Sequence, residues 1–249
     1  MEIRRSGLTL NLAKNNFPVA QVKFVGHIIG SGYREPDPEK VAAVKNLSPP
    51  IDKRQVCQVI GLFSYFREYI PDFAKYAYPL TELTKRGVPN KIPWGSEEQD
   101  AFDHLKFILC QAADAPLSII NCQKAYKLFV DASDYAVAAV LMQIDDTGRD
   151  RLVAFASVKL STWAKIEKEA YAAVWALQKF RRWIFWCPVT LFSDHNPLTY
   201  ITQASPRSSK LMRWALALQE FDVKFEYKEG RNNAAADCLS SRSAPLAIN

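Results

Sequence analysis

Acidic side chains stand at several places in the second half of the sequence where they could bind divalent cations. Asp131 follows the apolar residues of FVDASD, and Asp194 follows those of LFSDHN. Glu167 and Glu169 lie in IEKEAYAAVWALQKF, and Asp237 lies in AAADCLS. Carboxylates brought together repel one another unless metal ions neutralise them. Two Mg²⁺ ions about 4 Å apart can activate water and stabilise the leaving oxygen of a phosphodiester. The acids therefore point to metal-dependent phosphodiester hydrolysis.

The elements that carry these acids form an alternating pattern of strands and helices. Acids at the ends of strands in an α/β sheet collect in the crevice beyond those strands, and a helix packed on the sheet can add another. In chain order we expect strands at 127–134, 136–143 and 151–157, a helix at 166–180, a strand at 189–194, a helix at 208–219, a strand at 223–230 and a short helix around 234–241.

The helix at 166–180 offers two glutamates for the site. Its apolar stripe runs through Ile166, Ala170 and Ala173. At about 100° per residue, Glu167 and Glu169 flank that stripe on opposite sides, so periodicity cannot choose between them.

The first half of the sequence shows turn and capping signals that precede helices. Apolar residues alternate with polar ones in parts of 8–30, as in strands. Asp37 is a suitable N-cap before Pro38, and Ser96 with Gln99 has the spacing of a capping box. We therefore expect a small strand pair followed by helices.

Composition and charge restrict the class of partner. The net charge of +6 and the pI of about 9.0 favour an anionic partner, of which nucleic acid is the commonest. The five cysteines are odd in number and form no C-x-x-C pair, so we expect reduced thiols rather than a disulfide frame or a zinc site. The most apolar stretch, 183–192, is too short to span a bilayer, and the N-terminus has no secretory pattern.

The order of several long motifs resembles one known family. The segments FVDASDYAVAAVLMQ, IEKEAYAAVWALQKF, FSDHNPLTYI and YKEGRNNAAADCLS resemble the RNase H domain of gypsy-type LTR retrotransposon Pol polyproteins. The segments KFVGHIIGSG, VIGLFSYFREYIPDFAKYAYPLTELT and WGSEEQDAFDHLK look like the end of a reverse transcriptase palm, its thumb and its connection. The resemblance covers nearly the whole chain.

The resemblance implies an α/β fold with an RNase H-like five-stranded mixed sheet flanked by helices. A small, mostly helical thumb and connection region is expected before it. The implied division is 1–115 for the C-terminal part of the reverse transcriptase, 118–242 for the RNase H-like domain and 243–249 for a flexible tail.

The resemblance also assigns site residues. Matched position by position, the catalytic and metal-binding acids are Asp131, Glu169, Asp194 and Asp237, with Asp131 bridging two Mg²⁺ ions and Mn²⁺ as the alternative ion. The family match favours Glu169 over Glu167.

Basic residues next to these acids are candidates for nucleic-acid binding. Cations track phosphates, and the interleaved aromatics Phe180, Trp183 and Trp186 could stack on bases or sugars. The alternative is that Phe180 continues the apolar core face while the cations are solvated. The candidate binding residues are Lys179, Arg181, Arg182, Arg231 and Asn233.

The sequence departs from the family pattern in two ways. The adjacent aspartates Asp145 and Asp146 lie in QIDDTGRD, which reads as a polar hairpin turn, so a polymerase active site is not expected in this chain. The segment KLSTWAKIEKE is shorter than the family loop before the helix, which could tilt the helix and misplace Glu169.

The expected function is Mg²⁺-dependent cleavage of the RNA strand of RNA–DNA hybrids. The chain would be part of a reverse transcriptase polyprotein. The alternative function is a catalytically inactive nucleic-acid-binding remnant of a retroelement. Expected partners are the hybrid, its phosphate backbone and the rest of a Pol polyprotein, with no membrane partner. We expect an intracellular, cytoplasmic location with a nuclear one left open, and the sequence does not decide the oligomeric state.

Overall fold

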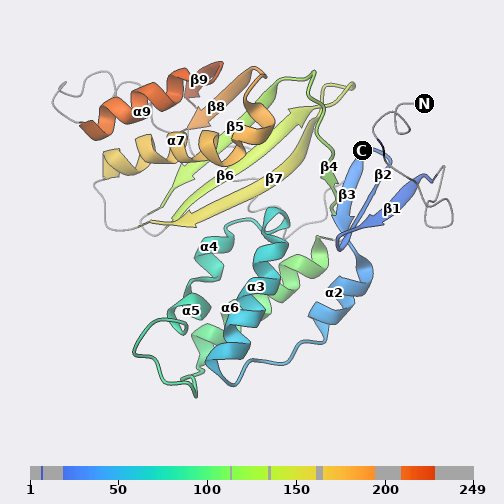
Figure 1. The fold of residues 1–249 in the computed structure, drawn as a ribbon, viewed down its shortest axis with the longest axis vertical. Coiled ribbons are helices and arrows are strands. Elements are labelled where there is room, and N and C mark those ends of the chain that lie inside the picture. The colour runs from blue at the N-terminus through green and yellow to red at the C-terminus, as the bar shows by residue number, and fades with distance from the viewer. Residues whose placement is uncertain are drawn as a thin grey trace.

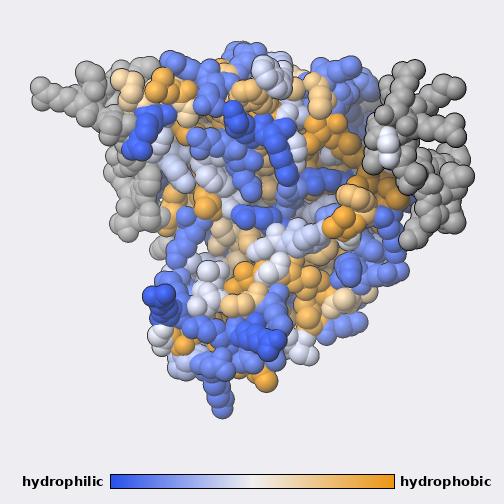
Figure 2. Space-filling model, viewed as in Figure 1, coloured by the Kyte–Doolittle hydropathy of each residue, from blue (hydrophilic) through white to orange (hydrophobic). Residues whose placement is uncertain are grey.

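The computed structural model describes residue 7 and residues 19–112, 114–133, 136–160, 165–193 and 209–227. Two sheets, one four-stranded and one five-stranded, are arranged with a group of helices below the larger sheet (Figure 1). On the face drawn in Figure 2, hydrophilic residues spread over both parts of the molecule, with smaller hydrophobic areas between them. No helix in the described ranges is both long and apolar enough to cross a bilayer.

The smaller sheet is built from tight hairpins. Its strands are β1 (Gln21–Phe24), β2 (His27–Gly30), β3 (Tyr33–Pro36) and β4 (Leu117–Ser118), paired antiparallel in that order. The two-residue loop at Val25 and Gly26 has φ angles of 46° and 72°, as a type I′ turn requires. The strands expected within 21–30 are confirmed, whereas β3 was not predicted and residues 8–18 lie outside the described part.

Helices follow this sheet and form the first hydrophobic core. They are α2 (Pro38–Lys45), α3 (Lys53–Tyr65), the 3₁₀ helix η2 (Arg67–Tyr69), α4 (Phe73–Tyr76), α5 (Tyr78–Glu82) and α6 (Ser96–Gln111). Fully buried side chains from several of these helices meet, including Phe63, Phe102 and Leu105. Aromatic and leucine side chains therefore hold the helical part together, and Leu152 of β7 packs against the same core.

Two predicted helix caps had different outcomes. The Asp37 carboxylate accepts a hydrogen bond from the Glu39 amide at 3.1 Å, which confirms the cap of α2. The prediction for Ser96 was wrong: Gly95 occupies the N-cap position of α6, and its amide donates to the Glu98 carboxylate at 2.9 Å. The Gln99 side chain instead accepts a hydrogen bond from Trp94 Nε1 at 2.9 Å, so it does not take part in the capping box.

The larger sheet confirms the predicted five-stranded mixed sheet. Its strand order is β7-β6-β5-β8-β9, with β5, β6 and β7 antiparallel and with β8 and β9 parallel to β5. The strands are β5 (Tyr126–Ala132), β6 (Ala136–Ile144), β7 (Asp150–Lys159), β8 (Val189–Ser193) and β9 (Val223–Tyr227). The aspartates of QIDDTGRD form the turn between β6 and β7, as predicted, with Gly148 at φ 82°.

Alternating side chains of β5 face the two sides of the sheet. Leu128 and Val130 belong to the core shared with α7 (Lys165–Ile184), which crosses the sheet beside α9 (Ser209–Gln219) (Figure 1). Phe129 points to the other face, where it stacks on Phe192 with ring centroids 4.7 Å apart. Burial on both faces explains why β5 and β6 read as nearly continuous apolar runs.

Both described histidines are packed in the N-terminal half. His27 Nδ1 lies 3.1 Å from the Tyr69 hydroxyl, and its ring stacks on those of Tyr65 and Tyr69. The ring centroid of His104 lies 4.0 Å from that of Tyr76, and its Nε2 is buried without a hydrogen-bond partner in the described structure. Burial lowers the pKa of both histidines, and the nearby cations Arg34 and Lys75 lower it further.

These histidines predict a loss of stability in mild acid. The pKa values of His27 and His104 in the folded chain lie below the ordinary value near 6.5. As the pH falls through 6.5, the unfolded chain therefore binds protons that the folded chain does not bind, and this favours unfolding. The free energy of unfolding should therefore fall between pH 7.5 and pH 5.5, as measured by urea denaturation at constant ionic strength. His104→Gln should make this decline shallower, and an equally steep decline in the variant would contradict the assignment to His104.

Candidate metal centre and the junction beside it

The carboxyl ends of β5 and β8 lie at the same edge of the sheet, where β5 carries the predicted acid Asp131. Asp131 is the penultimate residue of β5, and its side chain is exposed. The parallel strand β8 ends at Ser193, immediately before Asp194 in the chain. The described structure therefore places Asp131 at the expected edge of the sheet, whereas Asp194 itself lies outside the described residues.

The glutamate helix begins at this same edge. Lys159, the last residue of β7, pairs with Ala136, the first residue of β6, and α7 starts at Lys165. Figure 1 shows the N-terminal end of α7 on the side where β7 ends. Glu167 and Glu169 both lie in the first turns of α7, where the structure describes their backbone but not their side chains. The choice between them remains a prediction.

The fourth predicted acid and two of the predicted binding residues belong to the C-terminal segment after β9. Asp237, Arg231 and Asn233 lie outside the described residues. Among the described side chains, no group of three or more His, Cys, Asp and Glu could hold a metal ion. The exposed carboxylate of Asp131 is a hard oxygen donor of the kind that Mg²⁺ prefers, so the described part of the site fits that ion.

A carboxyl group from the helical half adds to the charge near Asp131. Asp72 precedes α4 in a left-handed backbone conformation with φ 47°. Its pKa is raised mainly by burial and further by the negative charge of Asp131, while Lys75 acts in the opposite direction. The helical half therefore contributes to the electrostatics of the candidate metal centre.

Hydrogen bonds from the helical half fix the edge strand next to this centre. Asp131 pairs with Ala138, which pairs in turn with Ser157 of β7. The Ser157 carbonyl accepts a hydrogen bond from Arg67 Nη2 at 2.6 Å, and the Ser157 hydroxyl accepts one from the Ala74 amide at 2.8 Å. Sequence reasoning did not identify this contact, because the partners are more than eighty positions apart.

Arg34 makes a second contact with the same edge. Its Nη2 donates to the Val153 carbonyl of β7 at 2.9 Å, and its Nη1 lies 2.6 Å from the Glu68 carboxylate. Its guanidinium carbon lies 5.7 Å from the ring centroids of both Tyr69 and Trp183. One side chain of β3 therefore connects η2, β7 and α7.

Two of the predicted nucleic-acid-binding cations on α7 have partners within the chain. Arg182 Nη2 lies 3.2 Å from the Glu68 carboxylate, and Arg181 Nη2 lies 3.5 Å from that of Glu220. Lys179 is exposed and has no ion-pair partner in the described part of the chain. The role of these three cations in nucleic-acid binding stays a prediction. Among them, only Lys179 forms no ion pair with the described residues.

The aromatic side chains of this segment divide between core and surface. Phe180 is 2% exposed and belongs to the core of the larger sheet, as the alternative interpretation expected. Trp183 is half-buried and stacks on Phe180 with ring centroids 5.6 Å apart. Trp186 is 90% exposed, so it remains available for an external contact.

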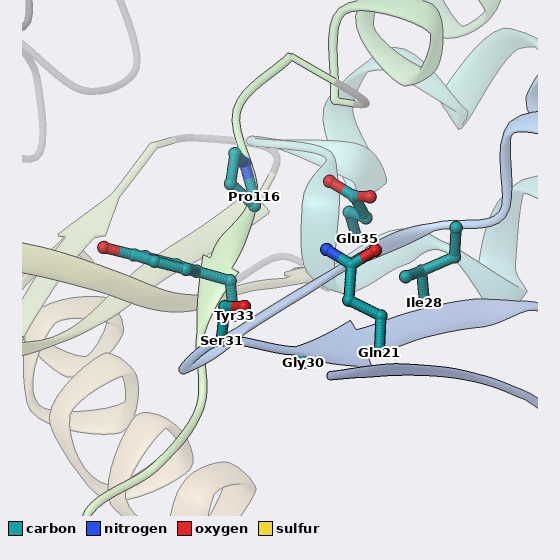
Figure 3. A pocket seen from close by; sticks show the side chains of 7 residues that line it. All are labelled: Gln21, Ile28, Gly30, Ser31, Tyr33, Glu35 and Pro116. Atoms are coloured by element: carbon teal, nitrogen blue, oxygen red, sulfur yellow. The ribbon is translucent and has the colours of Figure 1, made fainter. Parts of the chain in front are cut away.

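A separate hollow of about 100 Å³ lies on the smaller sheet (Figure 3). Gln21, Ile28 and Glu35 surround it, and the ring of Tyr33 is directed away from Glu35. Among its lining residues Glu35 is the only ionisable carboxyl group, and none is a cation. This hollow therefore lacks the convergent charged groups from which a reaction could be argued.

Comparison with known proteins agrees with this arrangement. Residues 121–221 match the family model described as an RNase H-like domain found in reverse transcriptase. A foamy viral protease-reverse transcriptase, solved in complex with an RNA/DNA hybrid, has the same fold with a TM-score of 0.70 and 20% identity. The alignment covers 85% of this chain and 29% of the viral one. The five-stranded sheet with α7 and α9 is thus an RNase H-like domain of the reverse transcriptase type.

The whole chain has relatives among Drosophila melanogaster retrotransposons. It is 34% identical to the Pol polyprotein of transposon opus and 30% identical to that of transposon gypsy, each over 96% of its length. These relatives are Pol polyproteins of transposons, gypsy among them, which confirms the resemblance found in the sequence. It spans about a quarter of the length of these relatives, 25% of the opus protein and 24% of the gypsy protein.

Replacing Arg34 should weaken the junction between the two halves. Arg34→Met removes the hydrogen bond to Val153 and the ion pair with Glu68, so the free energy of unfolding should fall by about 1.5–3 kcal/mol. Urea denaturation followed by tryptophan fluorescence measures this loss. Lys224→Met is the matched control, because the Lys224–Glu226 pair is exposed and should contribute little to stability. Equal losses in the two variants would contradict the importance of the Arg34 contacts.

Proposed function

We propose that this chain hydrolyses the RNA strand of RNA–DNA hybrids through a two-metal centre formed by Asp131, Glu169, Asp194 and Asp237. The observation that carries the proposal is the position of Asp131 at the carboxyl end of β5, beside the end of β8 and on the side where α7 begins. Strand ends that converge in this way form the active-site crevice of α/β sheets. The family match adds support, because it covers the elements that carry three of the four acids.

The chain's own residues would orient the ions and the substrate. Bound Mg²⁺, or Mn²⁺ in its place, would supply water activation and charge neutralisation. The backbone at Asp131 would be fixed relative to the sheet, because β5 pairs with β6 on one side and with β8 on the other. Cleavage would leave a 5′-phosphate and a 3′-hydroxyl. Recognition of the hybrid would rest on the 2′-hydroxyl and the groove shape rather than on base sequence.

The proposed partners follow from the same reasoning. The similarity to a reverse transcriptase solved with an RNA/DNA hybrid supports a hybrid substrate for this chain. The retrotransposon relatives support a place within a Pol polyprotein. The intracellular, cytoplasmic location stays an expectation from the sequence. We expect no DNA synthesis from this chain by itself, because its adjacent aspartates form the turn between β6 and β7.

A catalytically inactive remnant that binds nucleic acid is the second candidate function. The observation in its favour is the short connection from Lys159, which ends β7, to Lys165, which begins α7. A displacement of the glutamate by about 1 Å could cost about a hundredfold in rate. Binding without cleavage would distinguish this candidate from the nuclease.

The test compares cleavage of a labelled RNA–DNA hybrid by the wild-type chain and by Asp131→Asn in Mg²⁺. The wild type should cut the RNA strand, and the variant should lose about a hundredfold or more of the rate because it loses a metal ligand. Asp194→Asn should behave in the same way. EDTA should abolish cleavage by the wild type.

Asp146→Asn is the matched control, because that carboxylate is 95% exposed and lies in the turn between β6 and β7. It should retain the wild-type rate. If the wild type binds the hybrid without cutting it, the nuclease proposal fails and the inactive remnant takes its place.

A further inference from the structure

A hollow of about 170 Å³ lies at the junction between the helical half and the RNase H-like domain. Its floor contains Phe155 of β7 with Phe180 and Trp183 of α7. Phe155 and Phe180 are each 2% exposed, so the floor is apolar and rigidly packed. An apolar floor excludes water and strengthens electrostatic interactions at the mouth of the hollow.

The charged groups around this hollow are unbalanced. Arg67, Lys179 and Arg182 line it together with a single carboxylate, Glu68. That carboxylate already pairs with Arg182 and with Arg34. Three cations and one anion therefore line the hollow, and such an excess of positive charge costs free energy unless another anion is present.

Two of these cations have charge or hydrogen-bond donors that no described residue satisfies. Arg67 donates through Nη2 to the Ser157 carbonyl, but its Nε is buried without a hydrogen-bond partner in the described structure. Lys179 has no ion-pair partner in the same residues. Partial burial lowers the pKa of Lys179, and the neighbouring charges of Arg67 and Arg182 lower it further. The excess of positive charge and the unpartnered Arg67 Nε both suit an anionic ligand.

We propose that this hollow is a phosphate-binding site in which Lys179, with Arg67 and Arg182, holds a phosphate group at the mouth. The occupant is a backbone phosphate of the nucleic acid, an assignment that rests on the proposed function. Guanidinium and ammonium groups are the usual phosphate contacts of proteins, and they fix the position of a duplex without reading its sequence.

The position of the hollow on α7 relates it to the metal centre. Lys179 follows Glu169 by ten positions, which corresponds to about 15 Å along a helix. Lys179 therefore lies well away from the proposed metal centre, so a phosphate held in the hollow would be a different one from the phosphate whose bond is cut.

The first arm of the test measures binding of inorganic phosphate to the full chain without divalent metal, by isothermal titration calorimetry. The wild type should bind phosphate at a single saturable site, and Lys179→Gln should weaken it at least about tenfold, the loss of one charge-assisted contact. Lys179→Arg keeps the charge and should bind as the wild type does. Lys91→Gln removes an exposed lysine from a distant loop and is the control for net charge.

The second arm measures hybrid binding, again without divalent metal, over a range of salt concentrations. Loss of one phosphate contact should reduce the slope of log K against log salt by about 0.9 in Lys179→Gln, with no change in Lys91→Gln. Because neither arm involves cleavage, a failure of the nuclease proposal leaves both results interpretable.

Each outcome has a definite meaning. Loss of phosphate binding together with the smaller salt slope supports the site and its nucleic-acid occupant. Loss of phosphate binding with an unchanged slope supports a site for free phosphate and overturns its assignment to the hybrid. Equal phosphate binding by the wild type and Lys179→Gln overturns the proposal, and so does an absence of binding by the wild type.

Discussion

The outer edge of β7 needs partners for its outward carbonyl groups, and Arg34 and Arg67 provide them. An edge strand without partners would offer a row of polar groups to any other chain. Here the helical half covers that edge, so the two sheets and the helices form one connected structure. As a consequence, the two arginines that make this contact concentrate positive charge at the junction.

Glu68 links this junction to α7, because it pairs with both Arg34 and Arg182. The charges that join the halves therefore also shape the surface available to a ligand. Lys179 is left over once these pairs are formed, and it lies beside the aromatic floor of the hollow. The junction and the proposed phosphate site thus share Arg67 and Arg182, so a change in either arginine should affect both stability and the proposed binding.

The sequence predicted the elements with strong periodicity and missed those stabilised by distant partners. The apolar runs of β5 and β6 identified their strands, because both faces of each strand are buried. The strand β3 reads YREP and carries no such pattern, since its pairing comes from β2 and β4. At the site, strand ends predicted the location of Asp131, whereas the pairing of Glu68 with Arg182, 114 positions apart, has no local signal.

The length of α7 has a mechanical consequence. Arg182 ties one end of this helix to the helical half, and Glu169 lies near the other end, about 20 Å away at 1.5 Å per residue. A tilt of about 3° at the tied end would displace the backbone at Glu169 by about 1 Å, enough to slow the proposed hydrolysis. The contacts at the far end of α7 would thereby set a tolerance for the position of the proposed metal ligand.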